Sequence, residues 1–240
     1  MKPDFLKLAL TLPDIPRWVE TRGLLLAGRC EVYGATYSDD SDFVVRSLVD
    51  SLICVVGRPN ANAILQAISQ SGSSAEVLTA RENVEYVGSV LKSWHKCKAW
   101  IHSLNKDTEH AVAADATVKF VTGDEIFAIR DEAPELGKEL SNVLTITDVA
   151  AAIVRNQPVS FCYAGTETET LWDISIDTLP RHRRRGYAAT CVQFMIDFMR
   201  TKGKQPVWGA VDSNVASLNL ARKLGFQVVD ELFLFSKPVP

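Results

Sequence analysis

Long apolar runs are missing from this sequence of 240 residues. None approaches the ~20 consecutive apolar residues that a helix needs to cross a bilayer. The N-terminus has an early acidic residue, Asp4, and only a short apolar patch, so it lacks the pattern of a secretory signal peptide. We therefore expect neither a membrane span nor a membrane partner.

Paired cysteines and clustered histidines are also lacking. The five cysteines are scattered and odd in number, without a Cys-x-x-Cys pair, so no disulfide framework is expected. Reduced thiols are typical of the cytoplasm, and we expect a cytoplasmic protein. The four histidines, at positions 95, 102, 110 and 182, show no metal-ligand spacing, so we expect no metal site.

A strong excess of one charge is absent as well. The net charge of −3 gives no general reason to bind nucleic acid or an anionic membrane. One basic run, Arg181-His182-Arg183-Arg184-Arg185, could act as a nucleic-acid patch or a localisation signal. The run is short and isolated, and no aromatic residues alternate with it to stack on bases. We therefore expect no nucleic-acid partner.

What the sequence does contain is enough apolar surface for a packed core, with 47% hydrophobic and 23% charged residues. Helix-like and strand-like segments alternate in both halves, and the stretch Asn105–Ala114 between them has no clear period. We therefore predict two α/β domains, residues 1–112 and residues 113–240. No internal repeat is visible, and the sequence allows a homo-oligomer without requiring one.

The hydrophobic periods predict the following elements. In the first half we expect helices over residues 15–26, 61–68 and 84–94 and strands over residues 29–33, 43–46, 52–56, 76–78 and 98–104. In the second half we expect helices over residues 134–144, 187–202 and 214–225 and strands over residues 118–121, 126–129, 149–154, 159–164, 171–178, 207–211, 227–229 and 232–235.

Two turns lie between a strand and a helix, where phosphate groups often bind. The first, Gly57-Arg58-Pro59-Asn60, lacks the several glycines and the Lys-Ser/Thr of a Walker motif, which favours a plain turn. The second runs from Thr178 to Ala188 and is basic and glycine-containing. A helix N-terminus exposes backbone N–H groups with a partial positive charge. Gly186 lets backbone approach a ligand, and guanidinium groups add charge-assisted hydrogen bonds, so this turn is predicted to bind phosphate.

At these residues the chain resembles the GNAT superfamily of acyl-CoA-dependent N-acyltransferases. The family reads Arg/Gln-x-x-Gly-x-Gly/Ala at the turn that holds the CoA pyrophosphate, and this sequence has Arg183-x-x-Gly186-x-Ala188. A second element, from Asn214 to Gly225-Phe226, looks like the family's last helix with its Leu-Gly-Phe ending. The resemblance covers about the C-terminal half, from Ala116 onward.

This resemblance implies a mixed, mostly antiparallel sheet flanked by helices in residues 113–240, preceded by a smaller α/β domain. It also implies direct attack by an amine on acetyl-CoA in a ternary complex, with a small amine as the acceptor. The residues around Trp172–Thr178 and Trp208 are similar to those of a two-domain GNAT subgroup. The first domain then is either a diverged acyltransferase-like domain or a substrate-specificity domain. It shows no copy of the pyrophosphate turn, so we expect one CoA site per chain.

The resemblance also assigns cofactor contacts. The strand before the turn would pair with the pantetheine arm, and the turn would hold the pyrophosphate, while the strand 207–211 would splay away and open a cleft. The implied contacts are Ile176, Asp177 and Thr178 on the strand, Arg183, Arg184, Arg185, Gly186, Tyr187 and Ala188 in the turn, and Asn214 at the last helix.

The residue that accepts the proton of the attacking amine is less clearly marked. Asp173 and Glu169 are candidates for the base or the amine anchor, because a carboxylate in a partly desolvated cleft can have a raised pKa. The alternative is that both are solvated residues of a hairpin.

Many GNAT enzymes place a tyrosine, the acid for the leaving thiolate, where this chain has Ala221. Ser217, one helical turn earlier, could supply a hydroxyl there, or it could be a helix or CoA-edge contact. The missing tyrosine also motivates a rival function, in which the protein binds and senses acyl-CoA without consuming it.

Overall fold

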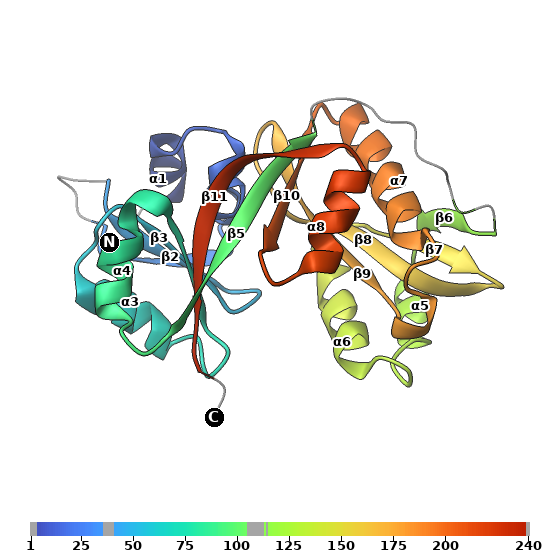
Figure 1. Cartoon of the computed structure of the whole chain (residues 1–240), viewed down its shortest axis with the longest axis horizontal. Coiled ribbons are helices and arrows are strands. Elements are labelled where there is room, and N and C mark those ends of the chain that lie inside the picture. The colour runs from blue at the N-terminus through green and yellow to red at the C-terminus, as the bar shows by residue number, and fades with distance from the viewer. Residues whose placement is uncertain (1–3, 36–40, 105–112, 114, 239–240) are drawn as a thin grey trace.

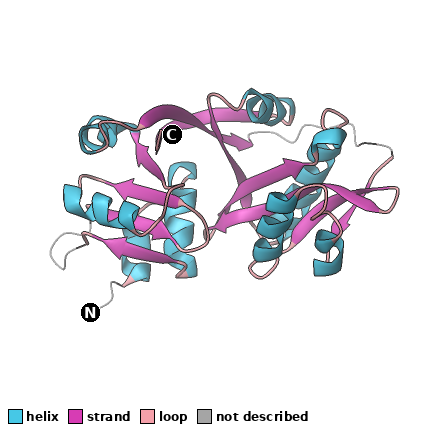
Figure 2. Ribbon diagram, turned by 90° about the horizontal axis from the view of Figure 1, so that it is seen from below, coloured by secondary structure: helices cyan, strands magenta, loops and turns pink. Residues whose placement is uncertain are grey.

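In a computed structural model, the structure describes residues 4–35, 41–104, 113 and 115–238. All strands of the described part join one eleven-stranded sheet, in the order β1-β2-β3-β4-β11-β5-β10-β9-β8-β7-β6. Two lobes of strands and helices, bridged by long strands, are visible in Figure 2. The sheet is mixed and mostly antiparallel, as predicted, and helices flank it.

The elements have the following bounds. The first half contains α1 (Phe5–Thr11), α2 (Val19–Ala27), β1 (Cys30–Tyr33), β2 (Phe43–Ser47), β3 (Leu52–Val56), α3 (Ala61–Ser69), β4 (Glu76–Ala80), α4 (Val84–Val90) and β5 (His95–Leu104). The second half contains β6 (Thr117–Phe120), α5 (Gly123–Phe127), α6 (Pro134–Val143), β7 (Val149–Val154), β8 (Gln157–Glu167), β9 (Leu171–Thr178), α7 (Tyr187–Thr201), β10 (Gln205–Val211), α8 (Val215–Lys223) and β11 (Phe226–Ser236). Short 3-10 turns cover Pro16–Trp18, Arg81–Asn83 and Pro180–His182.

The two halves repeat one order of elements. Each half contains three antiparallel strands, followed by a helix, a strand parallel to the third one, a second helix and a long last strand. The order is β1-β2-β3-α3-β4-α4-β5 in the first half and β7-β8-β9-α7-β10-α8-β11 in the second. No repeat is visible in the sequence, but the two halves share this topology. Pairing geometry depends on the backbone, so two halves can share it after their side chains have diverged.

The last strands of the two halves are exchanged. β11 lies between β4 and β5, and β5 lies between β11 and β10, all with antiparallel pairing. Figure 1 shows these two strands crossing from one lobe to the other. The β5–β11 register runs from Phe226↔Leu104 to Ser236↔His95 with a shift between Val228 and Asp230. Each lobe therefore depends on a strand from the other half of the chain.

Different helices cover different faces of the second lobe. α7 and α8 pack on one face over Trp172, Trp208 and Met195, which are fully buried. α5 and α6 cover the opposite face over Phe161 and Leu140. Since side chains alternate along a strand, β9 sends Trp172, Ile174 and Ile176 toward α7 and Asp173, Ser175 and Asp177 to the other face.

Three expectations from the sequence need correction or remain open. Residues 126–129 are not a strand: α5 begins at Gly123 after a capping box formed by Thr122 and Glu125. The two short strands expected over residues 227–235 are one strand, β11, whose bulge interrupts the hydrophobic pattern. The predicted domain boundary between residues 112 and 113 adjoins a stretch outside the described residues and stays a prediction.

Two findings bear on the classes excluded above. No helix in the described part of the chain is long and apolar enough to cross a membrane. Among the same residues, no group of three or more His, Cys, Asp or Glu side chains is arranged to hold a metal ion.

Candidate acyl-carrier and acceptor site

The candidate site begins where two parallel strands part. β9 and β10 pair only from Leu171↔Gln205 to Asp173↔Val207. Beyond Asp173, β9 continues to Thr178 beside β8, while β10 continues to Val211 beside β5. The two strand edges that face each other after this point are not paired with each other, so β9 offers backbone hydrogen-bonding groups to a ligand.

The residues that offer these groups can be read from the neighbouring bonds. The Leu179 N–H donates to the Val159 carbonyl of β8, and the Gln205 N–H of β10 donates to the Thr170 carbonyl. Because backbone groups alternate between the two edges of a strand, the even-numbered residues of β9 face the open edge and the odd-numbered ones face β8. Ile174, Ile176 and Thr178 therefore present their backbone groups to the open edge. Of the predicted contacts, Ile176 and Thr178 fit this geometry, whereas the Asp177 backbone faces β8.

The basic turn that follows β9 bends sharply into α7. Gly186 is the N-cap residue of α7 with φ +90°, and Arg184 has φ +61°. A Cβ atom at position 186 would lie 3.7 Å from the Ala113 Cβ, an ordinary van der Waals distance. The positive end of the α7 dipole lies at this turn, and α7 is 15 residues long. These features suit a bound anion.

The side chains of the turn extend this arrangement. Arg183, Arg184 and Arg185 are exposed, and the Arg183 Nε donates to the Thr178 carbonyl at 3.1 Å. The Nδ1 atom of His182 is buried and has no hydrogen-bond partner among the described residues. Buried polar atoms are nearly always hydrogen-bonded, so this ring nitrogen is an exception in the turn. Tyr187 is buried, and its hydroxyl donates to Asp115 Oδ2 at 2.8 Å, so this side chain is a support for α7.

A surface pocket adjoins the start of the turn. It has a volume of about 480 Å³ and is lined by Asp131, Glu132, Pro180 and Arg181. The pocket lies between the α5–α6 connection and the start of the basic turn.

Asp173 sits at the point where the strands part. Its register partner on β10 is Val207. Two glycines lie close to its carboxylate: a Cβ at Gly165 of β8 would lie 3.3 Å from its Oδ2, and one at Gly209 of β10 would lie 4.0 Å from its Oδ1. The carboxylate thus packs against backbone that carries no side chain at these two positions.

The charge state of Asp173 follows from its surroundings. Burial raises the pKa of Asp173 well above its ordinary value, and the nearby Glu20 carboxylate on α2 raises it further. Hydrogen bonds from the backbone amides of Ile174 and Gly209 lower the pKa, but burial dominates. A carboxyl group with a raised pKa can accept a proton near neutral pH, which is what a general base needs.

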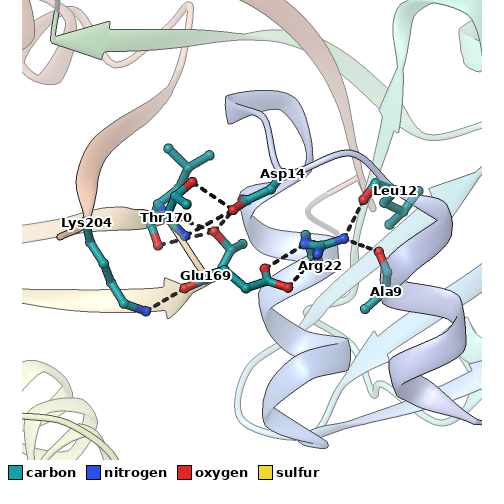
Figure 3. Close-up of polar contacts among 9 residues, drawn as sticks. Ala9, Leu12, Asp14, Arg22, Glu169, Thr170 and Lys204 are labelled. Atoms are coloured by element: carbon teal, nitrogen blue, oxygen red, sulfur yellow. Dashed lines mark hydrogen bonds and ion pairs between the residues drawn. The ribbon is translucent and has the colours of Figure 1, made fainter. Parts of the chain in front are cut away.

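Glu169, the second candidate base, forms an ion pair with Arg22. Both of its carboxylate oxygens accept from Arg22, at 2.8 and 2.5 Å, and Figure 3 shows this guanidinium also reaching the carbonyls of Ala9 and Leu12. The Arg22 side chain is only 7% exposed. The guanidinium lowers the pKa of Glu169, which opposes a role as base. Together with Asp14, which accepts from Thr168 and Thr170, this ion pair fastens α1 and α2 to the β8–β9 hairpin.

The α8 candidates have structural partners. Asn214 caps α8 by accepting from the Ser217 N–H, and the Ser217 hydroxyl accepts from the Trp208 indole at 2.9 Å. Ala221, at the position where the family has its tyrosine, is completely buried. No larger side chain fits there without displacing its neighbours, so a tyrosine is absent for packing reasons as well.

A second acidic group lies further along β9. Asp177 is half-buried, and burial and the Glu139 charge raise its pKa to about 6, while Arg183 lowers it. The Tyr163 hydroxyl donates to Glu139 Oε1 at 2.6 Å. The β9 face opposite α7 therefore carries carboxyl groups at both Asp173 and Asp177.

Comparisons with known proteins agree with this geometry. The family model described as GNAT acetyltransferase matches residues 150–235, which span β7 to β11. This part of the chain is therefore similar to GNAT acetyltransferase domains. No curated protein matches this sequence.

Solved structures show the same fold over nearly the whole chain. A GCN5-related N-acetyltransferase-like protein from Streptococcus suis 89/1591 is 16% identical with a TM-score of 0.69, covering 96% of each chain. A putative GNAT-family acetyltransferase from Novosphingobium aromaticivorans DSM 12444 is 14% identical with a TM-score of 0.62, covering 94% of this chain and 98% of that one. A tandem GNAT protein from the clavulanic acid biosynthesis pathway is 12% identical with a TM-score of 0.63, covering 99% and 95%. The family assignment supports an acyltransferase.

The turn after β3, at Gly57, has the same place in the first half as the Gly186 turn has in the second. The Asp42 side chain occupies the space in front of it. β3 and β4 pair over nearly their full length, from Leu52↔Glu76 to Val55↔Thr79, so they leave no open edge like that of β9. Gly57, in the turn after β3, has φ +62°, and a Cβ there would lie 1.9 Å from Asp42 Oδ1. The same carboxylate accepts from the Arg58 N–H at 2.8 Å. The Asp42 side chain fills the place that an external anion would take in the GNAT turn.

Three residues were not predicted from the sequence: His182 in the basic turn, Glu20 on α2, and Asp42 at the first-half turn. His182 was counted only as part of a basic run, although its position in the turn was a usable signal. Glu20 and Asp42 come from the first half, and nothing in their local sequence indicates what they face. Their roles depend on how the chain folds back on itself.

Proposed function

We propose that this protein is an N-acetyltransferase that moves an acetyl group from acetyl-CoA to an amine. The observation that carries the proposal is the unpaired β9 edge from Ile174 to Thr178, which leads directly into the Gly186 turn at the start of α7. A strand edge suits an extended amide-containing arm, and a helix N-terminus suits a diphosphate. CoA combines these two groups.

The turn and the strand would hold the carrier at different ends. The backbone of residues 183–188, with the guanidinium groups and His182 Nδ1, would contact the diphosphate. The backbone groups of Ile174, Ile176 and Thr178 would pair with the arm and direct the thioester toward Asp173. The Arg183–Thr178 hydrogen bond must then yield or rearrange when the carrier binds. Holding both reactants in line removes several kcal/mol of the barrier.

Asp173 would act as the base. The carboxylate takes a proton from the acceptor ammonium, and the neutral amine then attacks the thioester carbonyl carbon. The C–N bond forms, the C–S bond breaks, and the thiolate leaves with the electron pair of that bond. After the C–N bond has formed, the nitrogen releases its second proton to solvent water, and the thiolate gains one proton. Since Ala221 offers no hydroxyl, we assign the proton for the thiolate to water or to the Ser217 hydroxyl.

We further propose one carrier per chain, in the second half. The closed β3–β4 pairing and the Asp42 carboxylate on the first-half turn support this limit. The first half would then act as a partner lobe that supplies β5 and the α1–α2 pair to the catalytic half.

A second candidate is a sensor that binds acyl-CoA without turnover, and the complete burial of Ala221 favours it. A single pair of assays separates the two. Acetyl-CoA binding is measured by calorimetry, and thiol release is measured with a panel of amines. Binding with amine-dependent thiol release supports the enzyme; binding with no release above the hydrolysis rate for any amine supports the sensor. If acetyl-CoA does not bind at all, both functions are refuted.

A further inference from the structure

The connection between β5 and β6 joins the two halves, and its described end lies on the first turn of α7. The Ala113 N–H donates to Thr190 Oγ1 at 3.0 Å. Two residues later, Asp115 Oδ2 accepts from the Tyr187 hydroxyl at 2.8 Å. β6 follows and packs against α7, where the Phe120 ring contacts two aromatic rings of that helix. The chain that enters the second half is therefore fastened to α7.

The residues held by these bonds belong to the Gly186 turn and its continuation. Tyr187 is the first residue of α7, directly after the N-cap Gly186, and its side chain is buried. The Thr190 hydroxyl donates to the Gly186 carbonyl at 3.2 Å, so the bond from Ala113 continues through Thr190 to Gly186. The connection is thus linked to the turn at both Gly186 and Tyr187.

The backbone of this turn needs support from its surroundings. Arg184 has φ +61°, a conformation that a residue with a side chain adopts at a cost and keeps only where neighbouring groups hold it. A turn that is held before its ligand arrives loses less conformational entropy on binding, and the affinity is higher for that reason. The hydrogen bonds of Ala113 and Asp115 hold the helical side of the turn in this way.

The charge of Asp115 separates positioning from simple electrostatics. Its carboxylate is exposed and is bonded to the first residue of α7, at the end where the diphosphate is proposed to bind. Because like charges repel, Coulomb's law alone predicts that the loss of this carboxylate strengthens carrier binding. If the carboxylate instead holds Tyr187 in place, its loss weakens carrier binding.

We propose that Asp115 is a positioning residue for the acyl carrier. Through the Tyr187 hydroxyl it holds the first turn of α7, so that the N–H groups of the Gly186 turn are aligned before acetyl-CoA binds. This inference rests on the proposed acetyl-CoA site and adds to it the connection between the two halves. By linkage, acetyl-CoA that favours the held turn must equally favour the contacts that hold it.

The test measures acetyl-CoA affinity by calorimetric titration, with melting temperatures alongside. Tyr187→Phe removes only the hydroxyl, and Asp115→Ala removes the carboxylate; each should raise the Kd about three- to tenfold, as expected for one hydrogen bond. Asp115→Asn keeps an oxygen that can accept from the hydroxyl and should stay within about twofold of the wild type. The double variant Tyr187→Phe/Asp115→Ala should bind no more weakly than either single variant, because both remove the same bond. In turnover, the KM for acetyl-CoA should rise and the kcat at saturating carrier should stay unchanged.

Tyr163→Phe is the matched control. The Tyr163 hydroxyl also donates to a carboxylate, that of Glu139, at 2.6 Å, but Tyr163 lies on β8 and not at the turn. This variant should lose a similar amount of stability and keep the wild-type Kd for acetyl-CoA.

The outcomes separate this inference from the proposed function. Wild-type affinity in Tyr187→Phe, or tighter binding by Asp115→Ala, overturns the role of Asp115 and leaves acetyl transfer standing. An equal loss of affinity in Tyr163→Phe also overturns that role, because affinity then follows stability alone. Absence of acetyl-CoA binding to the wild-type protein overturns both the inference and the proposed function.

Discussion

Replacing Gly186 tests the carrier site with a pair of substitutions that differ only in charge. Gly186 has φ +90°, a conformation that costs L-residues about 1 kcal/mol or more, and Asn and Asp tolerate it better than other side chains. Gly186→Asn and Gly186→Asp therefore pay a similar backbone cost and place a side chain of the same size in front of the turn. Only Gly186→Asp adds a negative charge.

The expected difference follows from Coulomb's law. A unit charge about 6 Å from a phosphate charge costs about 3 kcal/mol at an effective dielectric constant of about 20. Screening by salt at this exposed turn reduces the cost to about half, so Gly186→Asp should bind acetyl-CoA roughly tenfold more weakly than Gly186→Asn. Both variants should bind more weakly than the wild type, since the added side chain blocks the approach to the backbone N–H groups. The difference should shrink as salt is added.

The assay is calorimetric titration with acetyl-CoA at low and high salt, with melting temperatures measured alongside. Gly203→Asp is the control, because Gly203 has φ +74°, lies beyond the other end of α7 and has open space around it. This variant should keep wild-type affinity. Wild-type affinity in Gly186→Asp, or equal affinities of the Asn and Asp variants at low salt, would refute the placement of the diphosphate at this turn.

Three further predictions concern acidic and basic groups on β9 and on α2. Asp173→Asn should lower kcat/KM about 10²-fold or more at neutral pH, and the loss should shrink at high pH, where the amine is neutral without a base; a pH-independent loss would remove Asp173 from proton transfer. Arg22→Ala should lower the free energy of unfolding by about 3 kcal/mol in denaturant titrations without changing acetyl-CoA affinity, because it leaves Glu169 and two carbonyls without their partner; a loss below that of a surface ion pair would contradict this. Burial raises the pKa of Asp177 from 3.8 to about 6, so the folded protein loses stability as the pH rises from about 4 to 6 and Asp177 ionises. Asp177→Asn should therefore raise the melting temperature at pH 8 and change it little below pH 4. Equal effects at the two pH values would contradict this direction.

The local part of the site could be predicted from the sequence because local physics determines it. An alternating run, a turn with Gly186 and a long amphipathic run give strand, turn and helix in this order, and the structure has β9, the turn and α7 at those places. The choice of Asp173 over Glu169 could not be made in this way. It depends on Arg22, which is distant in sequence and, of these two carboxylates, pairs with Glu169.

The arrangement of the two halves was beyond the local patterns for the same reason. The strands β5 and β11 are more than a hundred residues apart in the sequence, and neither contains a pattern that predicts its pairing partner. α2 of the first half packs against β9 of the second half, and Asp42 accepts from the Arg58 N–H at the turn after β3. Long-range pairing of this kind depends on total burial over both lobes, which no window of residues contains.

A crystal structure of the protein grown with saturating acetyl-CoA tests the central claim most directly. We predict one molecule per chain, with its diphosphate against the backbone of residues 183–188, its arm along Ile174–Thr178 and its thioester near Asp173. The turn at residues 57–60 should hold the Asp42 carboxylate and no carrier. Density for the carrier at the first-half turn, or none at residues 183–188, would contradict the account.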